Sequence, residues 1–340
     1  MTASPPVRWG ILGTANIARR QFLPALAEVG GGRAVLVAGR DGRRAAEWAA
    51  AEGVEAGVPG YATVLGSDEV DAVYIALPNS LHAEWTLQAL ATGKAVLCEK
   101  MLCRDAADVG PVLEAARRPG ALLWEAFVFP FQPQHQRLLE LVGSGTIGDP
   151  CEIISSYHFR VTQPTNIRLN AELGGGALAD VGCYPVRLAQ ELFGPPPDPP
   201  EVWCEAIDHG HEVETDAAAI VGWGGARLIF SVGFHRGYDA FTRVIGTTGQ
   251  VRLTNPYHPG PADTLTVLAD GKDPVVERPT TDARSFSAML GHIHGVLAGD
   301  EAPRQLAVEL SAPTASVVDA LQQACRPRRR GADLPNRTKR

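Results

Sequence analysis

Short apolar runs alternate with helical patterns through the first third of the chain. The apolar runs read as buried strands at 7–12, 34–38, 71–77 and 94–100. Apolar residues at helical spacing follow at 22–29, 43–52 and 85–90. Strands that alternate with helices this regularly predict a parallel, doubly wound sheet.

The second half of the chain has the pattern of a different sheet. Strands are expected at 151–159, 202–207, 217–223, 227–234, 241–245, 250–253 and 264–267, and Gly246-Thr-Thr-Gly249 predicts a tight turn. Such a run predicts an α+β unit with an open, mostly antiparallel sheet. Helices are expected at 285–297 and 307–324. The open face is a natural surface for a homo-oligomer, a dimer or a tetramer.

The length of 340 residues suits two domains rather than one core. We place the first domain at 1–123 and the second at 124–326. The last residues, 327–340, are basic and polar and are expected to form a flexible tail.

The first predicted strand runs directly into the segment Gly13-Thr14-Ala15-Asn16-Ile17-Ala18. This segment fits the dinucleotide fingerprint G-x-G-x-x-G/A, with alanine at the second and third glycine positions. The first glycine permits a sharp turn, and the following helix presents free N–H groups to a pyrophosphate. Because the segment lies between a strand and a helix, it predicts a Rossmann-type cofactor site.

The second strand ends in Gly39-Arg40-Asp41, with Arg44 one helical turn further on. An NAD site usually has an acidic residue at this strand tip, whereas arginine accepts the 2'-phosphate of NADP. We therefore favour NADP(H) over NAD(H). Two alternatives stay open: Arg40 and Arg44 decorate a solvated helix start, or Asp41 serves an NAD ribose.

Polar residues follow the next two strands. Leu77 ends one strand and precedes Asn79 and His82 at a strand-to-helix junction, and Glu99-Lys100 ends the other. Ligands of open α/β sheets bind outside these carboxyl ends. Only four of the 31 basic residues are lysines, so Lys100 is expected to do what arginine cannot, which is to lose its proton. An ordinary solvated lysine is the alternative.

Composition excludes several classes of function. The net charge of -7 argues against nucleic-acid and anionic-membrane partners, and no apolar run is long enough to span a bilayer. A cytoplasmic location is expected, because the amino terminus lacks a signal core. The six cysteines have no metal-ligand spacing and are interpreted as reduced and mostly buried. His209-Gly-His211 favours a surface turn, so no metal site is expected.

These segments resemble the glucose-fructose oxidoreductase, inositol dehydrogenase and MocA family of nicotinamide-dependent oxidoreductases. The resemblance is carried by 10–18, by Pro78-Asn79-x-x-His82, by Glu99-Lys100 and by the glycine-rich run 174–184. It implies a Rossmann domain, a second domain with an open antiparallel sheet, and an active site between them. Met101 replaces the usual proline, so a trans Lys100–Met101 bond is expected. Pro130 stands where many relatives carry arginine.

The resemblance also implies a catalytic group. Asp180 and Tyr184 lie four residues apart on a predicted helix and share one face. With Lys100 they suit the reduction of a carbonyl, to which the nicotinamide supplies hydride. We expect Tyr184 to donate the proton, Lys100 to lower the tyrosine pKa, and Asp180 to orient Lys100 or a substrate hydroxyl. Lys100 is the alternative donor, and Arg168 is a candidate substrate contact.

The glycine-rich run is similar to that of two groups within the family. One, which the chain resembles more closely, consists of nucleotide-sugar 3-ketoreductases, and it implies NADPH-dependent reduction of the C3 ketone of a dTDP-linked keto-deoxyhexose. The other contains NADP-dependent dehydrogenases of free sugars or dihydrodiols. A non-catalytic NADP(H) sensor is an alternative of a different class.

Overall fold

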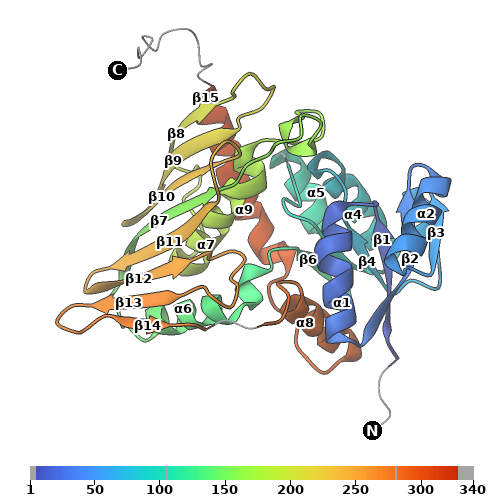
Figure 1. Ribbon diagram of the computed structural model, residues 1–340, viewed down its shortest axis with the longest axis horizontal. Helices are drawn as coiled ribbons and strands as arrows, with labels where there is room; N and C mark the ends of the chain where they lie inside the picture. Colours follow the sequence, from blue (N-terminus) through green and yellow to red (C-terminus); the bar gives the residue numbers. More distant parts are fainter. Residues whose placement is uncertain (1–4, 105, 280–281, 328–340) are drawn as a thin grey trace.

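A computed structural model of the protein describes residues 5–104, 106–279 and 282–327. It contains two β-sheets with helices packed between and around them (Figure 1). The helix α9 (Ala307–Ala324) runs between the two sheets (Figure 1). None of the described helices is both long and apolar enough to cross a membrane.

The first sheet is parallel and has the strand order β3-β2-β1-β4-β5-β6, as the alternating pattern predicts. Its strands are β1 (Val7–Leu12), β2 (Gly32–Gly39), β3 (Ala56–Pro59), β4 (Ala72–Ile75), β5 (Ala95–Cys98) and β6 (Leu123–Glu125). All residues of β4 and β5 are buried, because helices cover both faces of the sheet. The strand order reverses between β1 and β4, which opens a crevice at their carboxyl ends.

The helices of this half follow the strands in turn. They are a π-helical turn at Ala18–Phe22, α1 (Leu23–Val29), α2 (Gly42–Glu52), α3 (Tyr61–Leu65), α4 (His82–Ala91) and α5 (Ala106–Ala116). Phe22 stacks on Tyr74 of β4, with ring centroids 4.1 Å apart. The first helix is thereby fixed against the centre of the sheet.

The second sheet is mostly antiparallel, which confirms the expected fold class. Its order is β14-β13-β12-β11-β7-β10-β9-β8-β15. The strands are β7 (Pro150–His158), β8 (Val202–Ile207), β9 (Asp216–Trp223), β10 (Ala226–Gly233), β11 (Asp239–Gly246), β12 (Gly249–Thr254), β13 (Leu265–Ala269), β14 (Val275–Glu277) and β15 (Arg326–Pro327). Two pairs, β7 with β10 and β8 with β15, are parallel.

Helices cover one face of this sheet and leave the other open. Leu138 of α6 (Pro133–Gly143), Val186 of α7 (Cys183–Phe193) and Leu321 of α9 share one core with the inward residues of the strands. Outward residues of β8, β9 and β11 include the exposed Trp203, Ile220 and Phe241. The alternation along each strand therefore separates a core face from an open apolar face.

The chain returns to the first sheet near its end. Phe286 and the helix α8 (Ser287–Ala298) pack in the core formed by β1 and α1. His294 of α8 accepts a hydrogen bond from Trp9 Nε1 at 3.0 Å. Residues on both sides of the expected 123/124 boundary lie in β6. Pro327, the expected start of the tail, instead pairs with Ala206 of β8, and 328–340 lie outside the described residues.

The interpretation of all six cysteines as reduced is wrong for one pair. Cys204 of β8 and Cys325, just after α9, form a disulfide with their Cα atoms 4.9 Å apart. The two residues are 121 positions apart, so only the packing of α9 against β8 brings them together. The other four are free; Cys98, Cys103 and Cys183 are buried and Cys151 is half-buried.

Candidate active site

A cavity of about 680 Å³ lies at the carboxyl ends of β1, β2 and β4. Most of the residues expected to contact a cofactor line it, namely Gly13, Thr14, Ala15, Asn16, Ile17, Arg40, Arg44 and Leu77. The second half of the chain contributes residues 165–168, including Arg168. The cavity therefore extends from the predicted dinucleotide site to Arg168, the candidate substrate contact, whereas Lys100, Asp180 and Tyr184 are outside its lining.

Gly13, just after β1, lines this cavity. Its φ of +101° lies in the left-handed region, and a Cβ there would be 2.6 Å from the carbonyl oxygen of Ala76. No other residue type fits this close approach of two strand ends. The residues that lead into the following helix line the cavity, and the start of a helix is a place where a pyrophosphate binds.

The rim of the cavity beside β2 is positively charged. Arg40 and Arg44 are exposed there and both line the cavity. Asp41 Oδ1 accepts hydrogen bonds from the backbone N–H groups of Arg43 at 2.9 Å and Arg44 at 3.1 Å, and so begins α2. Because Asp41 serves as a helix cap, the two arginines are the groups at this rim that suit a phosphate.

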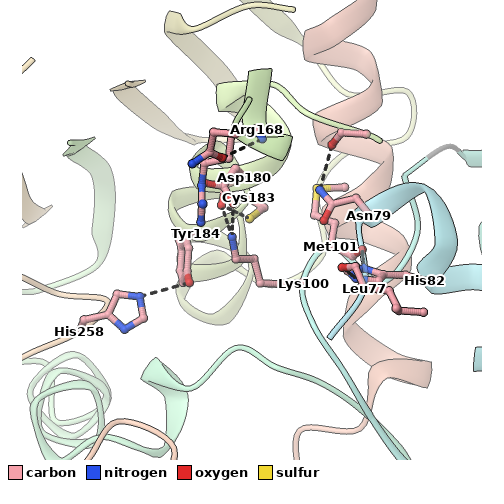
Figure 2. A network of polar contacts seen from close by, with 12 residues as sticks. Leu77, Asn79, His82, Lys100, Met101, Arg168, Asp180, Cys183, Tyr184 and His258 are labelled. Atoms are coloured by element: carbon pink, nitrogen blue, oxygen red, sulfur yellow. Dashed lines mark hydrogen bonds and ion pairs between the residues drawn. The ribbon is translucent and has the colours of Figure 1, made fainter. Parts of the chain in front are cut away.

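Lys100 and Asp180 meet between the two halves of the chain. Lys100 Nζ donates to the Asp180 backbone oxygen at 2.5 Å and to Oδ1 at 2.9 Å, and Arg168 Nε donates to Oδ2 at 2.6 Å (Figure 2). The lysine and aspartate side chains are only 10% and 14% exposed. The Asp180 carboxylate is thus bound by two cations, Lys100 just after β5 and Arg168 in the segment that follows β7.

These charges shift the pKa values in opposite directions. Burial opposes ionisation of Asp180, but Arg168 and Lys100 outweigh it and hold its pKa well below the usual range. Burial likewise opposes the charge on Lys100, yet the Asp180 carboxylate outweighs it and raises the lysine pKa. The expectation that Lys100 readily loses its proton is therefore wrong, since its counter-charge keeps it an ammonium.

Tyr184 lies on the same side of the helix as Asp180. Lys100 Nζ is 5.2 Å from the centroid of its ring, and the ring packs edge-on against Phe127 at 5.5 Å. Burial, reinforced by nearby Cys183, raises the tyrosine pKa well above its ordinary value. The net shift of the tyrosine pKa is therefore opposite to the acidification that we expect from Lys100, because burial dominates.

The hydroxyl of Tyr184 lies 3.3 Å from His258 Nε2 (Figure 2). His258 lies in the connection between β12 and β13, and burial lowers its pKa to about 4, so its ring is neutral at neutral pH. Sequence reasoning missed this residue. Its loop has no motif or spacing that links it to Tyr184, and only the fold brings the two together.

The short segment after Lys100 is fixed on both sides. A ring nitrogen of His82 is 2.7 Å from the Met101 carbonyl oxygen and the other is 2.8 Å from that of Leu77. The Leu102 N–H donates to the buried Glu125 Oε1 at 2.7 Å. Within this frame the Lys100–Met101 bond is cis, so the expected trans bond is wrong.

Three residues expected at the cofactor instead contact other parts of the protein. His82 is fully buried between the two carbonyl groups. Glu99 Oε1 accepts a hydrogen bond from the Tyr74 hydroxyl at 2.7 Å. Asn79 Nδ2 donates to the Gly174 backbone oxygen at 3.1 Å and links the first half to the glycine-rich loop. These contacts position the loops that surround the cavity.

Glu214 positions the helix that carries Asp180. Its Oε1 accepts from the Leu178 N–H at 3.1 Å, and its backbone oxygen accepts from the Ala177 N–H at 2.9 Å. Gly176 has a φ of +117°, and a Cβ there would lie 2.6 Å from Glu214 Oε1. The glycine run is thus required for the carboxylate to reach the start of the helix.

A dinucleotide-type cavity whose lining residue Arg168 binds the Asp180 partner of a buried lysine is typical of a nicotinamide-dependent oxidoreductase. Residues 7–127 match the oxidoreductase family with an NAD-binding Rossmann fold, and residues 135–252 match the GFO/IDH/MocA C-terminal domain. The chain belongs to this family, as its sequence motifs predict.

Several relatives share most of the chain. A dTDP-3,4-didehydro-2,6-dideoxy-alpha-D-glucose 3-reductase from Saccharopolyspora spinosa is 33% identical, over 94% of this chain and 98% of its own. A D-xylose 1-dehydrogenase (NADP(+)) from Haloferax volcanii is also 33% identical, over 78% and 81%. The solved structure of a 3-ketoreductase from Actinomadura kijaniata, in complex with NADP and TDP-benzene, has a TM-score of 0.84, 30% identity and coverage of 95% and 99%.

The buried ion pair makes a prediction about stability. Asp180→Ala leaves the buried Lys100 without its counter-charge and should lower the free energy of unfolding by about 3–5 kcal/mol. The double variant Lys100→Met/Asp180→Ala should recover about 1 kcal/mol or more of that loss, because the unpaired ammonium is removed as well. Urea unfolding measures both. If the loss of unfolding free energy in the double variant equals the sum of the losses in Lys100→Met and Asp180→Ala alone, the two residues are not coupled.

Proposed function

We propose that this protein uses NADPH to reduce the C3 ketone of a dTDP-linked keto-deoxyhexose. The observation that carries the proposal is the contact of Lys100 with Asp180 beside Tyr184, a group that Arg168 links to the cofactor cavity. Its support from relatives is the near full-length similarity to 3-ketoreductases, one of which was solved with NADP and TDP-benzene. The similar xylose dehydrogenase makes oxidation of free sugars the second candidate.

The cavity suits NADP in its shape and charge. Gly13 leaves room for a pyrophosphate at the helix start, and Arg40 and Arg44 offer planar guanidinium groups to a 2'-phosphate. A bound NADPH would supply the hydride. The residues of the chain then have to orient the sugar and deliver one proton to its carbonyl oxygen.

Tyr184 is our choice for the proton donor. Its raised pKa keeps the hydroxyl protonated at neutral pH, and the neutral His258 is its hydrogen-bond partner. As the carbonyl oxygen gains negative charge, the phenol gives up its proton to it. The charge left on the phenolate is favoured by the ammonium of Lys100, which the structure keeps protonated.

Lys100 has a separate role in this scheme. An ammonium has three N–H groups, and Asp180 engages two of them through its backbone and carboxylate oxygens. The third is available to polarise the carbonyl oxygen of the substrate. Asp180 orients Lys100, and Arg168 both braces Asp180 and faces the cavity as the candidate substrate contact.

The cofactor preference is testable at the rim of the cavity. Arg40→Ala and Arg44→Ala should each weaken NADPH binding about tenfold or more, because a charge-assisted hydrogen bond to the 2'-phosphate is lost. NADH binding should stay unchanged. The matched control is Arg43→Ala, an exposed neighbour outside the cavity lining. Fluorescence titration measures all three, and equal NADPH binding by all variants contradicts the assignment.

The catalytic roles are tested by nicotinamide absorbance. Tyr184→Phe and Lys100→Met should each lower kcat by about 10²–10⁴ without loss of NADPH binding. Tyr238→Phe, on an exposed tyrosine, is the control and should keep full activity. Because burial raises the pKa of Tyr184, activity of the wild type should not decline below about pH 9 as the pH rises. Full turnover by Tyr184→Phe would overturn its role.

The substrate is tested with two panels. One pairs NADPH with a dTDP-3,4-diketo-2,6-dideoxyhexose generated in situ, and the other pairs NADP with free aldoses and trans-dihydrodiols. We expect turnover only in the first panel. Turnover only in the second would replace the proposal with a sugar or diol dehydrogenase, and tight NADPH binding without turnover in either would replace it with a sensor.

We further propose that the protein forms a homo-oligomer through the open face of the second sheet. Support comes from the exposed apolar side chains that β8, β9, β11 and β14 present on this face, which are Trp203, Ile220, Phe241 and Val276. Trp203→Asp should shift the mass in solution, measured by light scattering, from an oligomer to a monomer. Trp203→Tyr keeps the apolar area and should keep the oligomer. A wild-type monomer contradicts the proposal.

A further inference from the structure

A cluster of metal-binding residue types lies at one end of the second sheet, and the oxidoreductase reaction does not use it. It consists of His209 in the β8–β9 loop, Asp216 at the start of β9, and His235 just after β10. We call it the His–Asp cluster. Asp216 is only 5% exposed.

The carboxylate of Asp216 is in an unusual state for a buried charge. Within the part of the chain that the structure describes, neither of its oxygens has a hydrogen-bond partner. Buried carboxylates are normally hydrogen-bonded or coordinate a cation, because leaving one unsatisfied is costly. Asp216 therefore points to a ligand at the cluster.

The distances suit a single ion. His209 Nδ1 is 3.4 Å and His235 Nδ1 is 3.5 Å from the same oxygen, Asp216 Oδ2. A tetrahedral zinc ion with bonds of about 2.0–2.1 Å places its ligand atoms about 3.3–3.4 Å apart. The two imidazole rings lie face to face, with centroids 3.9 Å apart, so one ring has to turn for both in-plane lone pairs to point at one ion.

Neighbouring polar groups lie against both sides of the cluster. Arg236 Nε, at 3.5 Å, and His158 Nδ1, at 3.7 Å, lie beside Oδ1, the other carboxylate oxygen. The Thr215 hydroxyl donates to the Ile207 carbonyl oxygen at 3.2 Å and its oxygen lies 2.9 Å from His209 Nδ1, so an ion has to displace this Nδ1–H···Oγ1 contact when it binds.

The ligand types of the His–Asp cluster also suit a metal ion. A neutral imidazole is the form that binds a metal, and two histidines with one carboxylate are typical ligands of zinc.

We propose that His209, Asp216 and His235 bind a divalent first-row transition metal ion such as Zn²⁺, with water in the fourth position. The spacing of His209 and His211 alone favours a surface turn, but the fold adds Asp216 and His235 from two other segments. The same β8–β9 loop carries Glu214, which positions the helix of Asp180. A bound ion would therefore fasten this loop to the ends of β9 and β10.

Isothermal titration of the full-length protein with zinc chloride, after removal of metal by a chelator, tests the site. We expect one ion per wild-type chain. His209→Gln and His235→Gln should each weaken binding about tenfold or more, because each removes one ligand. His211→Gln is the matched control in the same loop and should bind as the wild type does.

Thermal unfolding gives a second readout that does not depend on activity. Zinc should raise the midpoint for the wild type and for His211→Gln, and should raise it less for His235→Gln. NADPH titration of each variant shows whether it is folded. The proposal is overturned if the wild type shows no saturable binding, if folded His209→Gln and His235→Gln keep full affinity, or if His211→Gln loses affinity equally.

Discussion

The buried carboxylate of Asp180 is the interaction on which the active site depends. A charge that is removed from water is tolerated only when counter-charges and hydrogen bonds surround it. Lys100 comes from the end of β5 in the first sheet, and Arg168 comes from the segment that follows β7 in the second. The two halves of the chain must therefore meet at this carboxylate, and the cofactor cavity opens at the same place.

The segment that follows Lys100 is held by equally specific hydrogen bonds. Glu125 of β6 accepts hydrogen bonds from the Leu102 N–H and from the Ser311 hydroxyl of α9, so one buried carboxylate joins the first sheet, the segment after Lys100 and the central helix. His82 fixes the Met101 carbonyl from the other side. These contacts fix the backbone after Lys100 and so orient its side chain without the proline that the family usually has at the next position.

The protonation states of Lys100 and Tyr184 give these residues different roles in a carbonyl reduction. Asp180 keeps Lys100 an ammonium, whereas burial keeps Tyr184 a neutral phenol with a proton to give. The reasoning from sequence placed these residues in one group but assigned their pKa shifts wrongly. The sign of each shift depends on burial and on the neighbours that the fold supplies, and neither can be read from spacing along the chain.

Local patterns in the sequence determined the elements: the parallel sheet, the mostly antiparallel second sheet, the sharp turn at Gly13 and the shared face of Asp180 and Tyr184. These follow from periodicity and backbone conformation, which act over a few residues. The tertiary structure alone decided which distant residues meet. It placed His258 at Tyr184, joined Cys204 to Cys325, returned α8 to the first sheet and gathered the His–Asp cluster. Such partners lie far apart along the chain, so the topology of the sheets selects them, and no local pattern records that choice.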